Sequence, residues 1–209
     1  VWALLLAVGG VVLMLVPGGH RAWAWRAQGA ILLLPMLLAR VLVPQPGEFR
    51  VVAFDIGQGA AALVETTHHR LLFDTGPRYG DHADAAARVI VPYLRGHEAQ
   101  ALDALIVSHE DSDHAGATET VMAAVPVRTM LASLPPDHAL REIAQAYDVD
   151  AAGCVAGQRW TWDGVDFEIL HPVQAPAGGA RVSSNARSCV LRVGNARHAA
   201  LLTGDIEVA

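Results

Sequence analysis

The sequence predicts an α/β protein preceded by two apolar helices, and three observations support this fold class. The body of the chain, residues 48–209, opens with short strand-like segments separated by glycine turns, a pattern typical of an antiparallel meander. Apolar strands and helical segments then alternate, which favours layered sheets covered by helices. Two apolar runs lie within residues 1–43.

The apolar runs favour two transmembrane helices. Residues 1–16 carry no charge, and a second run covers residues 29–43. The second run reaches the length of about 20 residues that spans a bilayer if residues 23–30 join it and Arg40 extends its charge to the surface. A pair of buried helices in a soluble core is the alternative interpretation.

The order of the segments predicts a membrane domain at residues 1–43, a linker at 44–48 and a separate domain at 49–209. Arg21 and Arg26 lie between the two apolar runs. Because basic loop residues favour the cytoplasmic side, the body is expected on the opposite side of the membrane. The chain has no initiator Met and stops soon after a Thr-Gly-Asp turn, so we expect a piece of a longer protein, truncated at its C-terminus.

Composition excludes several classes of protein. The chain has 209 residues, of which 53% are hydrophobic, and a mean hydropathy of +0.31, which excludes disorder. All 15 basic residues are Arg. Three of these and none of the 21 acids fall in residues 1–47, so the body holds twelve Arg against 21 acids and is not a basic nucleic-acid-binding module. Two Cys exclude a disulfide-built scaffold and a Cys-rich zinc finger.

The elements of the body follow from local patterns, taken in chain order. Residues 48–54, 61–65 and 71–73 have strand character, and glycines mark the turn at 55–59. Residues 82–95 form a predicted helix with an apolar face. The remaining predicted elements are a buried strand at 104–107, a helix at 115–125, a strand at 127–131, a helix at 137–146, and strands at 160–162, 166–170, 189–193 and 199–202.

The strongest chemical signal is the loop that follows the buried strand at 104–107. It holds four potential metal ligands, His109, Asp111, Asp113 and His114. Imidazole combined with carboxylate suits a divalent cation, and a loop at a strand end lets these side chains converge. The alternative is a solvated acidic loop in which Asp113 caps the following helix.

This loop and its neighbours resemble the metallo-β-lactamase superfamily. Four ordered motifs carry the resemblance: Asp55-x-Gly57-Gln-Gly59, Phe73-Asp74-Thr-Gly76, His109-x-Asp111-x-Asp113-His114 and Leu201-Leu-Thr-Gly-Asp205. With Asp in the second ligand position, the set is similar to the C-terminal domain of the ComEC family, the membrane channels of bacterial DNA uptake in natural transformation. The resemblance extends over essentially the whole chain.

The resemblance implies an αββα sandwich with a site for two divalent metal ions at one sheet edge. His109 and Asp111 would bind the first metal, Asp113 and His114 the second, and Asp205 would bridge both. Asp111 in place of a His favours Mn²⁺ or Mg²⁺ over Zn²⁺. Two such metals activate a water for attack on a phosphodiester, with Asp113 as the catalytic residue.

Further positions match the family pattern. Asn185 stands where many relatives have a third His, so it either contacts metal or phosphate or is an ordinary polar loop residue. Asp74 and Asp55 are expected to orient ligands or hold turns. Gly57 and Gly59 allow a tight loop.

The implied function is a membrane-anchored part of DNA uptake whose domain hydrolyses the DNA phosphodiesters of the strand that is not imported. The implied partners are single- or double-stranded DNA, the membrane through the N-terminal helices, and other DNA-uptake machinery. The implied location is the bacterial inner membrane, with the domain extracytoplasmic. Because Ala60 replaces an acid found in many relatives, a non-catalytic domain that docks or gates DNA is an alternative. A hydrolase of the same fold that acts on small esters or phosphates is another.

Three features leave alternatives open. Cys154 and Cys189 form a disulfide or remain two free thiols. Trp160 and Trp162 alternate along a predicted strand, which favours core packing over base stacking. His171 ends a predicted strand and approaches the site edge or has no role there.

Overall fold

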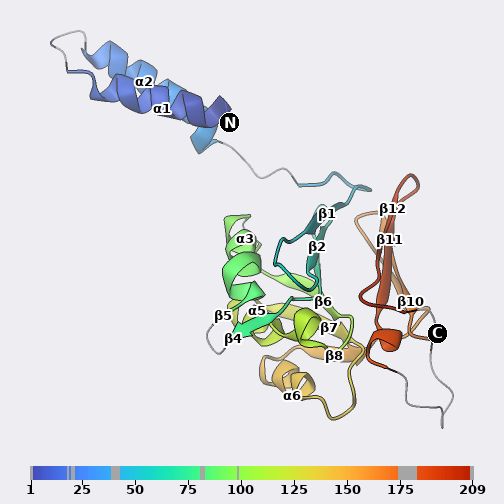
Figure 1. Cartoon of the computed structure of the whole chain (residues 1–209). Coiled ribbons are helices and arrows are strands. Elements are labelled where there is room, and N and C mark those ends of the chain that lie inside the picture. The colour runs from blue at the N-terminus through green and yellow to red at the C-terminus, as the bar shows by residue number, and fades with distance from the viewer. Residues whose placement is uncertain are drawn as a thin grey trace. The chain divides into compact units, whose positions relative to one another are not determined.

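The chain folds into two compact units, Val1–Leu42 and Val43–Ala209, whose elements are drawn in Figure 1. The computed structural model describes residues 2–17, 19, 22–38, 43–80, 83–97, 99–173 and 183–207. Arg21 and Arg40, which entered the predicted orientation and the predicted span, lie outside the described residues.

The first unit is a hairpin of two helices, α1 (Trp2–Leu15) and α2 (Ala22–Leu37). The helices touch at two glycines, since a Cβ atom on Gly10 would lie 2.6 Å from the Gly29 carbonyl oxygen. Across the described residues, no helix has the length and apolar character needed to cross a membrane. The two predicted transmembrane helices are therefore not confirmed.

The second unit begins with the predicted antiparallel meander, and parallel strands then extend it. The resulting six-stranded sheet has the order β1-β2-β3-β6-β7-β8. Its strands are β1 (Arg50–Ala53), β2 (Ala62–Glu65), β3 (Arg70–Phe73), β6 (Leu102–Val107), β7 (Val127–Ala132) and β8 (Asp150–Gly153).

A second, antiparallel sheet follows in the chain, with the order β12-β11-β10-β9. Its strands are β9 (Arg159–Trp162), β10 (Val165–His171), β11 (Val190–Gly194) and β12 (Ala199–Leu202). All four were predicted, as strands at 160–162, 166–170, 189–193 and 199–202. Cys154, just after β8, is disulfide-bonded to Cys189, just before β11, so the bond joins the two sheets.

Alternation along the central strands builds two cores, because successive side chains of a strand point to opposite faces. Leu72 and Leu105 belong to a core that includes helix residues such as Leu94. Leu71 and Ile106 belong to a second core that includes residues of β10 and β11. The six-stranded sheet is thus covered on both faces, by helices on one and by the second sheet on the other. Of the αββα sandwich, the described residues supply one helix layer and both sheets.

Two of the predicted helices differ from the observed ones. The predicted helix at 82–95 starts too early, because Ala83–Asp84 form β5, paired with β4 (Arg78–Gly80). A π-helical turn (Ala86–Ile90) and then α3 (Val91–Gly96) follow.

The predicted helix at 115–125 is divided into α4 (Ser112–Ala115) and α5 (Thr118–Ala124). The division occurs because the Ala117 amide donates to the Gly76 carbonyl, 3.2 Å away, instead of to its own helix. The third predicted helix is observed as α6 (Ala139–Ala146).

Candidate metal centre

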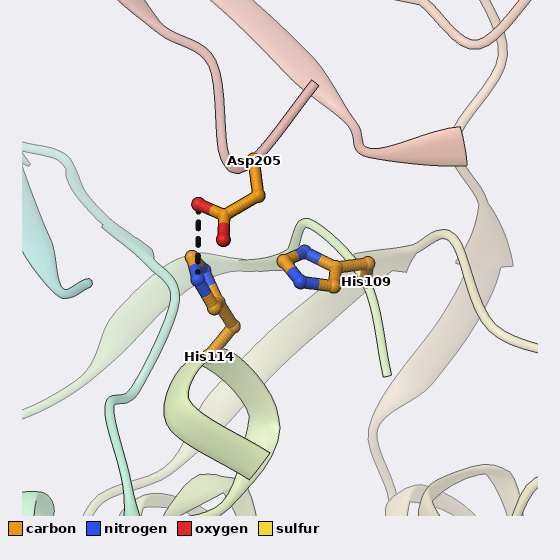
Figure 2. Close-up of side chains that lie close together, drawn as sticks. All are labelled: His109, His114 and Asp205. Atoms are coloured by element: carbon orange, nitrogen blue, oxygen red, sulfur yellow. Dashed lines mark ion pairs between the residues drawn. The ribbon is translucent and has the colours of Figure 1, made fainter. Parts of the chain in front are cut away.

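Three chain segments meet at one end of the sandwich. The parallel strands β3 and β6 are neighbours, so the residues that follow them, Asp74 and His109, lie at the same sheet edge. His114 lies in α4, at the end of the loop after β6. Asp205 follows β12 of the other sheet. The site is therefore assembled from both sheets, as Figure 2 shows.

Two buried imidazoles and one half-exposed carboxylate form the centre. One ligand atom from each of His109, His114 and Asp205 lies within 4.8 Å of the others. His114 Nε2 is 3.3 Å from Asp205 Oδ1, and the two imidazole centroids are 4.2 Å apart. Such a cluster can hold a divalent cation, since imidazole nitrogen and carboxylate oxygen are ordinary ligands of transition metals.

The two other predicted ligands lie on the same loop. Asp111 Oδ2 is 3.5 Å from His109 Nε2, and the Asp111 side chain is 44% exposed. Asp113 lies close enough to His114 to affect its pKa, and its carbonyl accepts a hydrogen bond from the Ala60 amide at 3.2 Å. Among the described residues, the cluster of side chains that could hold a metal ion contains His109, His114 and Asp205 but neither Asp111 nor Asp113.

A single buried carboxylate orients both imidazoles. Asp74 Oδ2 accepts from His114 Nδ1 at 2.8 Å and from the Ser108 hydroxyl at 2.8 Å. Because that hydroxyl gives its one proton to Asp74, its oxygen accepts from His109 Nδ1, 2.9 Å away. In their neutral forms both rings then carry their proton on Nδ1, which leaves the Nε2 lone pairs available for a metal. In metal sites, a carboxylate bonded in this way fixes the orientation of an imidazole ligand.

The charge around His114 favours its protonated form when no cation is bound. Burial by itself lowers the pKa of His114, but the hydrogen bond and charge of Asp74, with the charges of Asp205 and Asp113, outweigh burial and raise the pKa above its ordinary value. The same negative charges would stabilise a bound cation.

One buried nitrogen atom without a hydrogen-bond partner indicates whether a metal fits this site. His109 Nε2 is buried and has no hydrogen-bond partner among the described residues. An orphaned buried nitrogen is costly, and a metal ion at the centre of the cluster would satisfy it. The residues present therefore fit a divalent metal.

The remaining predicted residues are not part of this cluster. Asn185 Nδ2 donates to Glu207 Oε1 at 3.1 Å, while Asn185 Oδ1 is buried without a partner among the described residues. Gly59 has φ +107°, and a Cβ there would lie 2.1 Å from the Asp113 carbonyl oxygen, so only glycine fits. Gly57 has φ +77° with open space around it. Asp55 is exposed in the turn before them.

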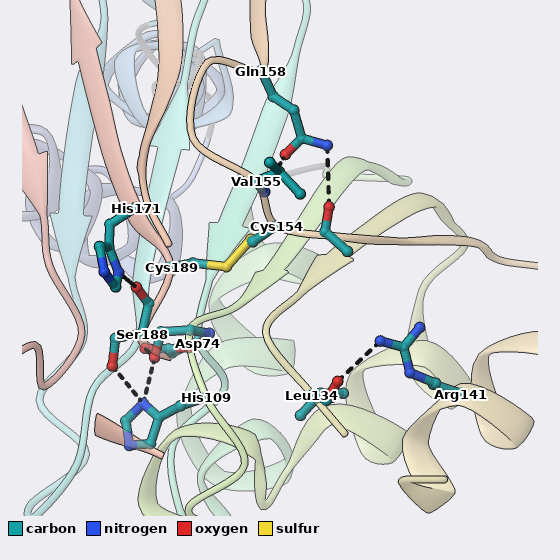
Figure 3. Close-up of a disulfide and its surroundings, with 12 residues drawn as sticks. Asp74, His109, Leu134, Arg141, Cys154, Val155, Gln158, His171, Ser188 and Cys189 are labelled. Carbon is teal, nitrogen blue, oxygen red and sulfur yellow. Dashed lines mark hydrogen bonds between the residues drawn. A yellow bond between two sulfur atoms is a disulfide. The ribbon is translucent and has the colours of Figure 1, made fainter. Parts of the chain in front are cut away.

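Sequence reasoning missed a second support on the other sheet. The Ser188 hydroxyl is 3.3 Å from His109 Nδ1, and the Ser188 carbonyl accepts from His171 Nδ1 at 2.9 Å. His171 is thus connected to His109 only through Ser188, and it does not belong to the cluster of His109, His114 and Asp205. Cys189, the next residue, is bonded to Cys154 (Figure 3). The Cys189 amide donates to the Ser108 carbonyl at 2.8 Å. The signal in the sequence was weak, since serines at strand ends are common.

Comparisons with known proteins agree with this geometry. The sequence profile of the metallo-beta-lactamase superfamily matches residues 54–206. The chain is 37% identical over 205 residues to competence protein ComA of Neisseria gonorrhoeae, covering 98% of this chain and 26% of that protein. It is 32% identical over 179 residues to recombination protein 2 of Haemophilus influenzae, covering 86% of this chain and 21% of that protein. The chain thus spans about a quarter of the length of these relatives.

Among solved structures, a metallo-beta-lactamase from Cronobacter sakazakii aligns with a TM-score of 0.47 and 18% identity. The alignment covers 76% of this chain and 60% of that chain.

Proposed function

This chain belongs to the metallo-beta-lactamase superfamily, and from this premise we propose that its body is a metal-dependent phosphodiesterase that cleaves DNA during DNA uptake. The observation that carries the proposal is the buried Nε2 of His109, which has no hydrogen-bond partner among the described residues and belongs to the cluster with His114 and Asp205.

We propose that two divalent metals occupy the site. His109 and Asp111 would hold the first and His114 and Asp113 the second, with Asp205 as a ligand that both would share. When bound, such ions offset charge on phosphate oxygens and lower the pKa of a water. Asp113 would accept the proton of that water, and Asp74 would hold both imidazoles in the protonation state that leaves Nε2 free.

The names of the relatives support DNA as the substrate. The chain is similar to a competence protein and a recombination protein, and we propose that this body degrades the strand that is not imported. Its acidic composition is compatible with a polyanionic substrate because bound cations reverse the local charge.

We further propose that the first unit anchors the protein in the bacterial inner membrane, next to other DNA-uptake machinery, with the body extracytoplasmic. Large apolar side chains such as Trp2, Leu5 and Leu37 are exposed on α1 and α2, and lipid or other apolar helices would cover them. The disulfide between Cys154 and Cys189 supports an oxidising compartment for the body.

A cleavage assay on the full-length protein with Mn²⁺ and single- or double-stranded DNA tests the activity. We expect Asp113→Ala to lower the cleavage rate by about a hundredfold or more. Asp137→Ala removes an exposed carboxylate after β7 and serves as the matched control with an unchanged rate. Wild-type cleavage no greater than that of Asp113→Ala would overturn the phosphodiesterase proposal.

Two other functions predict different results in the same assay. A docking or gating domain, favoured by Ala60 beside Asp113, predicts DNA binding without cleavage. A hydrolase of small esters or phosphates predicts turnover of those compounds while the DNA stays intact.

Metal analysis of the purified protein tests the proposed preference for Mn²⁺ or Mg²⁺ over Zn²⁺. Stoichiometric zinc alone would contradict this preference.

A further inference from the structure

The carboxylate of Asp205 reaches the centre on a short turn rather than on a helix or a strand. The turn Thr203-Gly204-Asp205 follows β12, the last strand of the second sheet. The Asp205 side chain is 50% exposed, whereas His109 and His114 are buried. Because a ligand must be held within about 0.5 Å of its working position, such a turn needs support from other parts of the fold.

The first support is the surface on which Gly204 packs. Gly204 has φ 53°, and a Cβ atom there would lie 2.8 Å from Ser108 Oγ and 3.2 Å from Ser188 Cβ. Both serines are completely buried, and their hydroxyls lie 2.9 Å and 3.3 Å from His109 Nδ1. The turn therefore rests on the two residues that also contact the imidazole, and only a glycine can approach them so closely.

The second support is a hydrogen bond just beyond Asp205. Asn185 Nδ2 donates to Glu207 Oε1 at 3.1 Å. Asn185 begins a 3₁₀ turn (Asn185–Arg187), and its carbonyl accepts from the Ser188 amide at 2.9 Å. The amide side chain thus extends from an ordered turn and holds the residue two positions after the proposed ligand.

The same 3₁₀ turn also contacts the loop that carries the imidazoles. Arg187 Nη2 is 3.6 Å from Glu110 Oε1, and Glu110 lies between His109 and Asp111. A long, partly exposed ion pair contributes little to stability, but it shows that the 3₁₀ turn lies against this loop. Residues 185–187 therefore contact both the loop from the first sheet and the segment that follows Asp205.

We propose that Asn185 and Gly204 are positioning residues that hold Asp205 over the two imidazoles. Asn185 acts through Glu207, and Gly204 acts through its close packing on the buried serines. The inference rests on the proposed function, because it takes Asp205 to be a metal ligand. It gives Asn185 a role other than direct contact with metal, since an amide nitrogen such as Nδ2 is a donor with no lone pair for a cation.

Reversing the polarity of the hydrogen bond tests the role of Asn185. Asn185→Asp replaces the donor by an acceptor, so that two carboxylates repel each other and the turn is displaced. We expect the Mn²⁺ affinity of the full-length protein, measured by isothermal titration, to fall about tenfold. Adding Glu207→Gln supplies a donor from the other side and should restore the affinity to near the wild-type value. Direct coordination by Asn185 predicts the opposite sign, because a carboxylate suits Mn²⁺, so Asn185→Asp alone would raise the affinity.

Gly204→Ala tests the packing of the turn and is also expected to lower Mn²⁺ affinity about tenfold. Gly157→Ala is its matched control, because Gly157 also has a positive φ, 93°, but a Cβ there meets nothing within 4 Å. Asn195→Asp is the control for the charge change. Asn195 is in the second sheet's β11–β12 turn, and its Nδ2 donates to the Gly47 carbonyl at 2.8 Å. Both controls should bind Mn²⁺ as wild type does.

The inference and the proposed function fail in distinguishable ways. An unchanged or raised Mn²⁺ affinity in Asn185→Asp, or no recovery when Glu207→Gln is added, overturns the positioning role even if DNA cleavage depends on Asp113. A weakened affinity that Glu207→Gln restores, in a wild-type protein that binds Mn²⁺ but does not cleave DNA, overturns only the phosphodiesterase. A wild-type protein that binds no Mn²⁺ overturns both.

Discussion

At the residue scale, one carboxylate supports both imidazoles of the centre. Asp74 contacts His114 directly and reaches His109 through Ser108. The sequence offered candidate ligands in the loop because they are close together in the chain, and of these the cluster contains His109 and His114 but neither Asp111 nor Asp113. It also offered Asp74 as a candidate orienting residue. It did not predict Ser108 as the bridge, because that role depends on which partner takes the one hydroxyl proton, and only the folded arrangement decides it.

Asp74→Asn is therefore expected to weaken metal binding. The amide can donate as well as accept, so the ordered protonation of both imidazoles is lost, and removal of such a supporting group costs about 10- to 100-fold in metal affinity. Asp74 has φ 58°, a conformation that Asn tolerates, so the backbone is not strained by the change. Isothermal titration with Mn²⁺ measures the effect.

Asp84→Asn is the matched control for this change. Asp84 is also buried and also accepts from a backbone amide and a hydroxyl, those of Ala87 and Thr120, but it lies outside the centre. Equal Mn²⁺ affinities for Asp74→Asn and wild type would contradict the orienting role.

At the element scale, short apolar segments between turns were sufficient to predict the strands that build the two cores. This criterion failed for β8, whose sequence Asp-Ala-Ala-Gly has low strand propensity. That strand forms because β7 offers an open parallel edge, which only the assembled sheet provides. The division between α4 and α5 could not be predicted either, because the Ala117 amide donates to the carbonyl of Gly76, which lies in a turn far away in the sequence.

One contact between elements predicts a dependence of stability on pH. Asp163, in the turn between β9 and β10, accepts hydrogen bonds from Thr66 and from the His68 amide in the turn between β2 and β3. Burial by itself raises the pKa of Asp163, but the hydrogen bonds from His68, Thr66 and His69 lower it well below its ordinary value. The ionised carboxylate therefore stabilises the fold.

This stabilisation is present above the pKa of an unfolded Asp, about 3.9, and is lost as the pH falls toward the lower folded value. Wild type should consequently lose more Tm than Asp163→Asn between about pH 5 and about pH 3. Asp166→Asn, at an exposed position of β10, should follow wild type. Parallel decreases of Tm in wild type and Asp163→Asn would show that the carboxylate contributes nothing.

At the scale of the whole second unit, the disulfide joins the two sheets beneath the centre. Replacing both Cys154 and Cys189 by Ala should lower the free energy of unfolding by about 2–4 kcal/mol, measured by denaturant titration. Mn²⁺ affinity should fall as well, because Cys189 adjoins Ser188, which contacts His109. Loss of stability with unchanged Mn²⁺ affinity would limit the bond to a structural role.

The division of the centre between the two sheets also has a consequence for when the protein becomes active. Asp74 and His109 come from the first sheet, and Asp205 comes from the end of the second. A partly made or partly folded chain therefore lacks a complete ligand set, and high metal affinity arises only when both sheets have docked. The order in which the two sheets form thus determines when the centre can take up metal.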